Sequence, residues 1–257
     1  MMPLLAIASP QLPYELGEVV TQQLFIGDHI THTDCRSPFT SSRAWLAARI
    51  NLYVKDALKV LIDVTLEAED HDREAASNIM NISMKLLMLL PKLFPSADDE
   101  EKDSFVLFNH DLDIQNILVH PDGDLTGVID WECIHTSPLW HACQLPKFLC
   151  GSTQNTLPVE SDFMVREDKD AEWELDDMYA IRLRQYEQTQ LRKLFFKEME
   201  EVCPEWVGVF RESTLKADFE LAVQNIDNDL CSGIILNWAE AALMGEESDS
   251  LRDLFRR

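Results

Sequence analysis

Apolar residues recur at helical spacing along two long stretches in the first half of the chain. The first runs from about residue 42 to 66, with apolar positions at Leu46, Ile50, Tyr53, Val54, Ala57, Leu58 and Leu61. The second runs from about residue 72 to 92, with apolar positions at Ala75, Ile79, Ile82, Leu86, Leu89, Leu90 and Leu93. Residues three and four apart share one face of a helix, so both stretches are predicted to be amphipathic helices that contribute to a core. Thr40 to Ser42 supply an N-cap, and Pro91 and Pro95 mark the second helix end.

Helical patterns return in the carboxy-terminal half. A long amphipathic helix is predicted over residues 170–201, and two more over residues 212–230 and 234–244. Before them, residues 137–149 predict a short amphipathic helix. Residues 151–170 are polar, acidic and interrupted by proline, which is typical of a loop.

Runs that favour β-strands occur in two places. Near the start, residues 18–26 and 29–33 flank Gly27-Asp28, which predicts a hairpin. We therefore expect a leading segment over residues 1–39, followed by one domain over residues 40–257. Between the helical halves lie three short apolar runs, at Phe105–Phe108, Asn116–His120 and Leu125–Ile129. Asp122-Gly123 separates the last two runs and predicts a tight hairpin turn.

Acidic and amide residues lie where these central runs begin and end. Asp111 and Asn116 bracket one loop, and Asp130 follows the hairpin that returns the chain to the same place. A carboxylate, a carboxamide and a second carboxylate can thereby meet around one point. Phosphoryl transfer from a nucleotide needs such a set, because one Asp accepts the proton of the attacking hydroxyl while an Asn and another Asp hold Mg²⁺.

The segments Asp111-Leu-Asp-Ile-Gln-Asn116 and Val128-Ile-Asp-Trp-Glu132 resemble, in order and spacing, two motifs of one known family. These are the D-x-x-x-x-N loop and the I-D-[WF] strand end of the aminoglycoside phosphotransferase and choline kinase-like family, especially its fungal members. The resemblance implies Asp111 as catalytic base, with Asn116 and Asp130 as ligands of the Mg²⁺ that accompanies ATP. It also implies a mostly helical α+β fold, namely a protein kinase-like carboxy-terminal lobe with a short catalytic hairpin.

Two features depart from the family's pattern. The family usually has His two residues before the base to support the loop, whereas this chain has Asn109, with His110 beside it on the opposite strand face. The family also has an amino-terminal nucleotide lobe, and no counterpart precedes the predicted leading hairpin. The eight glycines form no phosphate-cradling cluster. We therefore expect a truncated member whose binding of MgATP is weak or absent, because much of the electrostatic preorganisation is missing.

Composition narrows the class of partner. The chain has 22 basic and 46 acidic side chains and a formal net charge of −24, which argues against nucleic acid and anionic membranes. An amine-bearing small molecule is compatible with this charge. The six cysteines form no C-x-x-C pair or zinc spacing, and there is neither a basic signal-peptide start nor an apolar stretch of membrane-spanning length. These features favour a cytoplasmic location.

Two functions remain open. One is an ATP-dependent phosphotransferase that acts on a small-molecule hydroxyl and is weak or inactive alone. The other is a non-catalytic, pseudokinase-like remnant that binds a small molecule or a protein. Several further polar or aromatic residues are candidates for the site or for a metal cluster: Asp113 and Glu132; His29, His32 and Asp34; Trp140 and His141; and Asp176, Asp177 and Glu187. Turns, core packing and solvated helix faces explain these residues more simply. Neither the acceptor nor the oligomeric state follows from the sequence.

Overall fold

The computed structural model describes residues 17–18, 22–27, 29–32, 36, 38–62, 70–95, 104–132, 134–166, 174–246 and 248–255. Helices predominate, and three two-stranded sheets accompany them, so the predicted mostly helical α+β class is confirmed. Contacts within the chain divide it into two compact units. The helical unit contains residues 6–106, 138–141 and 212–257, and the hairpin unit contains residues 107–137 and 142–211.

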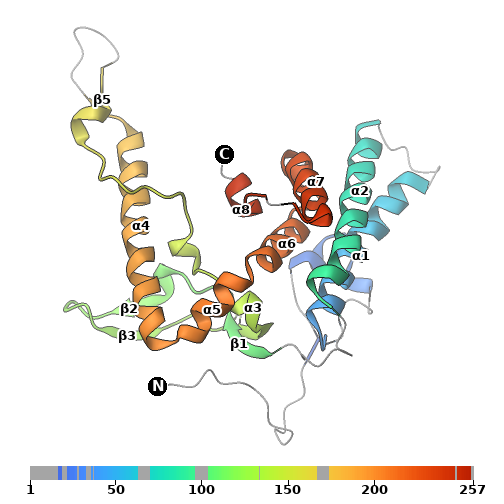
Figure 1. Ribbon diagram of the computed structural model, residues 1–257, viewed down its shortest axis with the longest axis horizontal. Coiled ribbons are helices and arrows are strands. Elements are labelled where there is room, and N and C mark those ends of the chain that lie inside the picture. The colour runs from blue at the N-terminus through green and yellow to red at the C-terminus, as the bar shows by residue number, and fades with distance from the viewer. Residues whose placement is uncertain are drawn as a thin grey trace, which may run out of the picture. The chain divides into compact units, whose positions relative to one another are not determined.

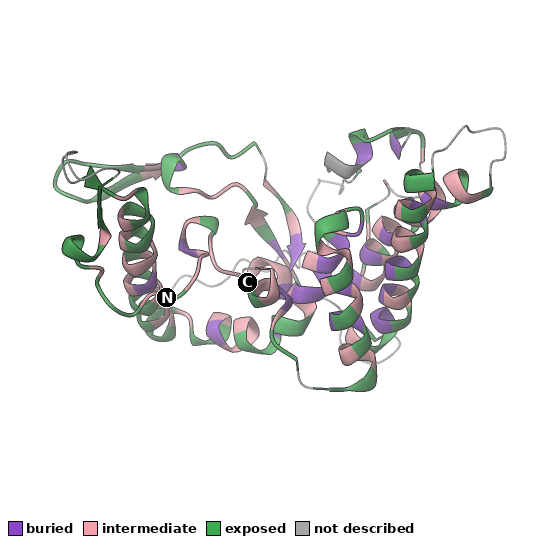
Figure 2. Cartoon of the chain, turned by 90° about the horizontal axis from the view of Figure 1, so that it is seen from above, coloured by how far each residue is buried: buried purple, intermediate pink, exposed green. Residues whose placement is uncertain are grey.

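Five helices build most of the helical unit. They are α1 (Ser42–Ile62), α2 (Asp70–Leu93), α6 (Thr214–Gln224), α7 (Asp229–Met244) and α8 (Leu251–Leu254). α1 packs along α2, and α2 also packs against α7 (Figure 1). Large apolar side chains fill the space between these helices, at positions that Figure 2 colours purple. They include Leu46, Ile50, Ile82, Leu86, Leu89, Phe219, Ile235 and Trp238.

The first two predicted helices are confirmed in α1 and α2. Most of the predicted apolar stripe positions on them are buried or half-buried, because residues at helical spacing face the same neighbouring helix. Leu58 is an exception, being 39% exposed, so the buried stripe of α1 is narrower than the sequence predicts. Pro91 lies inside α2, which continues to Leu93.

The last two predicted helices are displaced. Residues 225–228 separate α6 from α7, whereas the sequence predicts a separation at residues 231–233. The side chain of Asn228 accepts a hydrogen bond from Leu230 N at 3.2 Å and caps α7. Gly245 then ends α7 with φ of 73°, a left-handed conformation that glycine adopts without strain.

A buried carboxylate holds the short last helix in place. Asp218 of α6 is 4% exposed, and its Oδ2 accepts a hydrogen bond from Leu251 N at 2.9 Å. Its Oδ1 accepts further hydrogen bonds from Ser250 Oγ and Arg252 N. Burial raises the pKa of Asp218, and these hydrogen bonds oppose the shift only in part. A side chain distant in sequence thus accepts hydrogen bonds from the first main-chain amides of α8.

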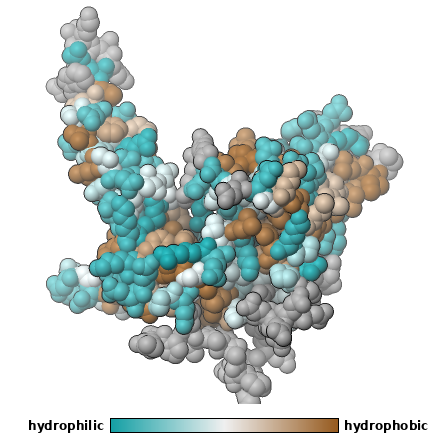
Figure 3. Space-filling model, viewed as in Figure 1, coloured by the Kyte–Doolittle hydropathy of each residue, from teal (hydrophilic) through white to brown (hydrophobic). Residues whose placement is uncertain are grey.

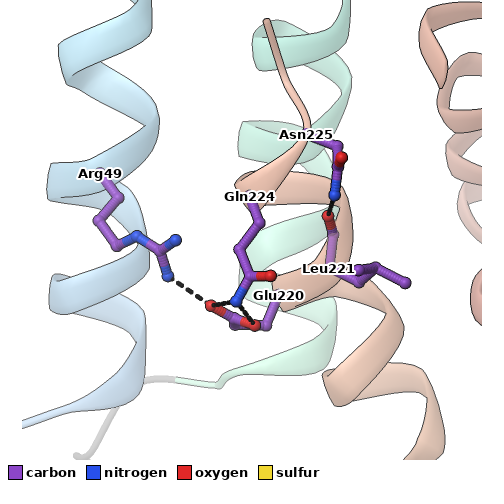
Figure 4. Close-up of polar contacts among 5 residues, drawn as sticks. All are labelled: Arg49, Glu220, Leu221, Gln224 and Asn225. Atoms are coloured by element: carbon purple, nitrogen blue, oxygen red, sulfur yellow. Dashed lines mark hydrogen bonds and ion pairs between the residues drawn. The ribbon is translucent and has the colours of Figure 1, made fainter. Parts of the chain in front are cut away.

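A second buried carboxylate links α1 to α6 (Figure 4). Arg49 Nη1 lies 2.7 Å from Glu220 Oε1, and Gln224 Nε2 donates to both oxygens of Glu220 at 2.8 and 2.6 Å. Burial alone would raise the pKa of Glu220, but the Arg49 guanidinium, with lesser help from His141 and Gln224, outweighs burial and lowers it. The Arg49 guanidinium also lies over the ring of Trp45.

The single helix predicted over residues 137–149 is wrong. Residues Ile134–Pro138 form strand β4, Leu139–Ala142 form the short helix α3, and Lys147–Leu149 form the 3₁₀ helix η5. Proline at positions 138 and 146 interrupts the helical pattern. Trp140 is 6% exposed and donates from Nε1 to Ser42 Oγ at 2.8 Å, so its interpretation as a core residue is confirmed.

The hairpin unit carries the central predicted hairpin (Figure 1). Strand β2 (Ile117–Val119) pairs antiparallel with β3 (Leu125–Val128), in a register that sets Ile117 opposite Val128. Gly123 takes φ of 92° in the connecting turn, and Gly123 N donates to His120 O at 2.8 Å. The predicted hairpin turn is therefore confirmed. Strand β1 (Phe105–Asn109), also predicted, forms a two-stranded sheet with β4.

Two helices follow in the hairpin unit. α4 (Asp177–Val202) begins after Asp176, whose side chain accepts a hydrogen bond from Met178 N at 2.8 Å. α5 (Pro204–Glu212) is not among the predicted helices. It begins at Pro204, and proline is favoured in the first helical turn. The predicted loop over residues 151–170 contains the 3₁₀ helix η6 (Glu160–Phe163) and strand β5 (Met164–Val165), which pairs with β6 (Glu174–Leu175).

The hairpin predicted in the leading segment is wrong for the described residues. They form two 3₁₀ helices, η1 (Gln22–Phe25) and η2 (His29–Thr31). His29 is buried, and its Nε2 lies 2.5 Å from Oδ2 of Asp56 in α1. This contact with a distant part of the chain outweighs the β propensity of the segment. Asp34, the third member of the suggested metal cluster, lies outside the described residues.

Hydrophilic side chains cover much of the surface seen in Figure 3, with apolar patches between them. Among the described residues, no helix combines the length and the apolar character needed to cross a membrane. The described cysteines Cys143, Cys150, Cys203 and Cys231 are free thiols.

Candidate functional site

The loop after β1 is shaped by two side-chain caps. Asn109 Oδ1 accepts a hydrogen bond from Asp111 N at 2.9 Å, an arrangement typical of an Asx turn. Asp113 Oδ1 accepts from Ile114 N at 2.6 Å and caps the 3₁₀ helix η4 (Ile114–Asn116). The interpretation of Asp113 as a loop residue is therefore confirmed. Asn109 occupies the position at which the phosphotransferase family described above usually has His. Its side chain fixes the main chain at Asp111 through this hydrogen bond.

Asn116 closes this loop. It is 6% exposed, and its Nδ2 donates to the main-chain oxygen of Asp111 at 3.0 Å. Since the amide nitrogen is used in this way, Oδ1 is the side-chain atom of Asn116 that can bind a cation. The two ends of the predicted D-x-x-x-x-N loop are thus fastened to one another by the residue proposed as a metal ligand.

The hairpin brings Asp130 back to this loop. Ile129 N donates to Asn116 O at 2.9 Å, which extends the pairing of β2 with β3 and sets Asp130 one residue from that bond. Asp130 is exposed and has φ of 62°. It is the non-glycine residue with positive φ among those the structure describes. Such a conformation costs about 1–2 kcal/mol for most side chains and less for Asp, and it recurs at functional sites.

A lysine that the sequence did not indicate joins the site. Lys147 Nζ, in η5, lies 3.3 Å from Asp111 Oδ1, and both side chains are partly exposed. An exposed ion pair of this kind contributes about 0–1 kcal/mol to stability, so its main effect is to add positive charge beside the carboxylate. No local motif links positions 111 and 147, because their proximity depends on how residues 143–150 fold back.

α4 holds the η5 segment in place. Arg192 Nη1 donates to Leu149 O at 3.1 Å and to Gly151 O at 2.7 Å, and its Nη2 donates to Ser152 O at 3.1 Å. Gln188 Nε2 donates to Phe148 O at 3.1 Å. Hydrogen bonds to a charged donor are stronger than neutral ones. The position of Lys147 therefore depends on side chains of α4 more than 40 residues later in the sequence.

The donor set fits a magnesium ion by its chemistry. The Asn116 carboxamide and the Asp130 carboxylate offer hard oxygen atoms, which Mg²⁺ prefers, and Mg²⁺ commonly keeps several water ligands. The described residues contain no group of three or more His, Cys, Asp or Glu side chains placed to share a metal ion. The predicted site differs from such a cluster because the protein supplies only two metal ligands, one Asn and one Asp. That the two oxygens and Asp111 share one cation stays a prediction.

The remaining suggested contacts have other positions. Glu132 is exposed, immediately after the site. Asp176 is the N-cap of α4, as described above, and Asp177 and Glu187 lie exposed on that helix. His141 belongs to the helical unit, where its ring contacts Trp45 edge-on. These findings agree with turns, caps, core packing and solvated helix faces.

A hollow of about 440 Å³ lies elsewhere in the hairpin unit. Its lining comes from the loop before η6, from η6 itself and from α4, and includes Leu157, Val159, Phe163 and Arg182. None of Asp111, Asn116 and Asp130 lines it, so the candidate site is defined by loop geometry and not by this hollow.

Comparison with known proteins adds no relative. No protein-family model, no curated protein and no solved structure matches the chain.

Proposed function

We propose that the chain is the larger-lobe part of a kinase-like phosphotransferase, which transfers a phosphoryl group from MgATP to the hydroxyl of a small molecule. One observation supports this most. The hydrogen bonds from Asn116 Nδ2 to Asp111 O and from Ile129 N to Asn116 O fasten the loop and the strand end that carry the three proposed residues. The local structure thus has the strand, loop and hairpin order that the two motifs require.

Each residue has a distinct role in this proposal. Asp111 accepts the proton of the acceptor hydroxyl, and Lys147 beside it orients the carboxylate and supplies positive charge near the transferred group. Asn116 Oδ1 and the Asp130 carboxylate would hold Mg²⁺. When bound, the ion neutralises charge on the phosphates of ATP. Asn109 holds the main chain at Asp111, which limits the directions that the base can take.

The acceptor is proposed to be a hydroxyl-bearing small molecule that also carries an amine. The formal net charge of −24 favours a cationic ligand over an anionic one. A cytoplasmic location, where ATP is abundant, belongs to the same proposal. Neither nucleic acid nor a membrane is proposed as a partner.

Turnover by these 257 residues is expected to be slow. The sequence contains eight glycines and none of them form a phosphate-cradling loop, so ATP would be held mainly through the metal. The test is ATP consumption with Mg²⁺ across a panel of amino alcohols and amino sugars. Asp111→Asn and Asp130→Asn should reduce turnover to background.

Asp122→Asn is the matched control, because Asp122 is an exposed acidic residue of the same hairpin, paired with His120. Turnover that survives Asp111→Asn, or that falls equally in Asp122→Asn, would count against the proposed roles. If no compound of the panel shows turnover that depends on Asp111, the phosphotransferase proposal fails and the non-catalytic function described next replaces it.

The second candidate is a non-catalytic remnant that binds a protein or a small molecule. Exposed apolar residues on and beside the hairpin favour it, since a partner could bury them. They are Ile114, Leu118, Val119, Leu125, Ile129 and Trp131, exposed by 44–66%. The ion pair between Lys147 and Asp111 also favours it, because the carboxylate is already engaged without a substrate. Saturable ligand binding that is indifferent to Asp111→Asn, with no turnover, would identify this function.

A further inference from the structure

Two histidines that play no part in the proposed phosphoryl transfer lie side by side in the hairpin unit. His110 follows the last residue of β1, and His135 lies in β4, the strand that pairs with β1. Their ring centres are 6.1 Å apart, and the ring planes are inclined by 54°. Both side chains are exposed, so a hydrated cation can reach them.

Phe108 supports both rings. It lies in β1, two residues before His110, and its ring meets His110 edge-on at 6.1 Å. The same ring meets His135 edge-on at 5.7 Å, with an interplanar angle of 89°. Ring contacts of this kind restrict rotation of the imidazoles, so less conformational entropy is lost when both bind one ligand.

The spacing suits a shared metal ion. A metal–nitrogen bond to imidazole is about 2.0–2.1 Å, which places the ring centre roughly 3 Å from the metal. Two imidazoles on one cation therefore have ring centres roughly 5–6 Å apart, close to the separation seen here.

We propose that His110 and His135 form a two-imidazole binding site for a divalent transition-metal cation of the Cu²⁺, Ni²⁺ or Zn²⁺ class. Imidazole nitrogen suits these ions, whereas Mg²⁺ prefers oxygen ligands, so this site is chemically distinct from the one proposed at Asn116 and Asp130. Water fills the remaining coordination positions. His135 lies in β4 and His110 directly follows β1 of the same sheet, which limits how far the two residues can move apart. The sequence separation of 25 residues explains why no motif indicates the site.

Cu²⁺ titration followed by electron paramagnetic resonance tests this proposal on the whole chain. Accessible thiols are first blocked by alkylation, because free thiols bind Cu²⁺ and reduce it. One Cu²⁺ should bind with a spectrum showing two imidazole nitrogens. His110→Ala and His135→Ala should each weaken binding by about 100-fold, because a chelate becomes a single ligand.

His120→Ala is the matched control, since His120 is an exposed histidine on the same unit that pairs with Asp122. It should bind Cu²⁺ as the wild type does. A single-nitrogen spectrum in the wild type, no binding, or wild-type affinity in either alanine variant would overturn the site.

A second measurement uses only the unaltered chain. During a Zn²⁺ titration, nuclear magnetic resonance signals from the His110 and His135 rings should shift together at one saturation point. Independent shifts, or no shift at one of the two rings, would also overturn the proposal.

Discussion

The side-chain amide of Asn116 donates to the main-chain oxygen of Asp111, and this 3.0 Å bond joins the two ends of the candidate catalytic loop. The residue proposed to bind the cation therefore also sets the position of the proposed base. A change at Asn116 should consequently affect folding and chemistry together.

Asn116→Ala should lower the free energy of unfolding by about 1–3 kcal/mol, because the carbonyl of Asp111 loses its buried donor. Denaturant titration followed by circular dichroism measures this. Gln115→Ala is the control, since Gln115 is the exposed neighbour on the same 3₁₀ turn, and it should change stability by less than about 0.5 kcal/mol. Equal effects of the two substitutions would show that the loop is not closed by Asn116.

Arg192→Ala should remove three main-chain hydrogen bonds that hold the η5 segment and lower the free energy of unfolding by about 1–3 kcal/mol. If the proposed activity is present, turnover should fall as well, although Arg192 does not contact the three proposed site residues in the structure. Lys193→Ala is the control, because Lys193 Nζ donates to the side chain of the exposed Asn155 and not to the η5 segment. Hydrogen exchange at residues 147–152 should quicken in the first variant and not in the second.

Arg49→Met should destabilise the helical unit by about 3–5 kcal/mol, because Glu220 would keep a buried charge without its cation. Lys197→Met is the contrasting case. Lys197 and Glu198 form an exposed pair at 3.9 Å, so its removal should cost about 0–1 kcal/mol. Thermal or denaturant unfolding distinguishes the two, and a small effect of Arg49→Met would show that the buried pair carries little net stabilisation.

Acidification should remove the contribution that the ionised Glu220 side chain makes to the free energy of unfolding. Its pKa is lowered in the folded chain, so its contribution to stability is complete above the ordinary carboxyl pKa and is lost as the pH falls through the lowered folded pKa. Wild type should therefore exceed Glu220→Gln in the free energy of unfolding at neutral pH, with a gap that narrows in acid. A gap that stays constant from neutral to strongly acidic pH would contradict the lowered pKa.

Gly123→Ala should lower the free energy of unfolding by about 1 kcal/mol, because φ of 92° strains any residue with a Cβ atom. An added Cβ at position 123 meets no atom within 4 Å, so strain and not a clash is responsible. Gly127→Ala, in the same hairpin, also meets no atom and has no positive φ. It should therefore be close to neutral, and urea unfolding curves of both variants provide the comparison.

Local signals predicted the parts of the fold that local forces decide. The apolar stripes of α1 and α2, and the Asp122-Gly123 turn, depend on spacing and turn chemistry within a few residues. The leading segment differs from the predicted hairpin, because the buried His29 makes a long-range contact with Asp56 of α1 that β propensity does not anticipate. The boundary between α6 and α7 differs from the predicted one because the side chain of Asn228 caps α7.

The residues of the candidate site also fall into two groups, those that local sequence predicts and those that it does not. The loop from Asp111 to Asn116 and the strand end at Asp130 follow from motif order and hairpin geometry. Lys147 and the imidazole pair at His110 and His135 do not, because each depends on segments distant in sequence that meet only after folding. Long-range pairs of this kind leave no periodic trace in a single sequence.

The left-handed backbone at Asp130 places two requirements on one position. Glycine there would keep the main-chain path while deleting the carboxylate, whereas glutamate would keep a carboxylate while straining the path. Comparing Asp130→Gly with Asp130→Glu would therefore separate the contribution of the main-chain conformation at this residue from that of its negative charge.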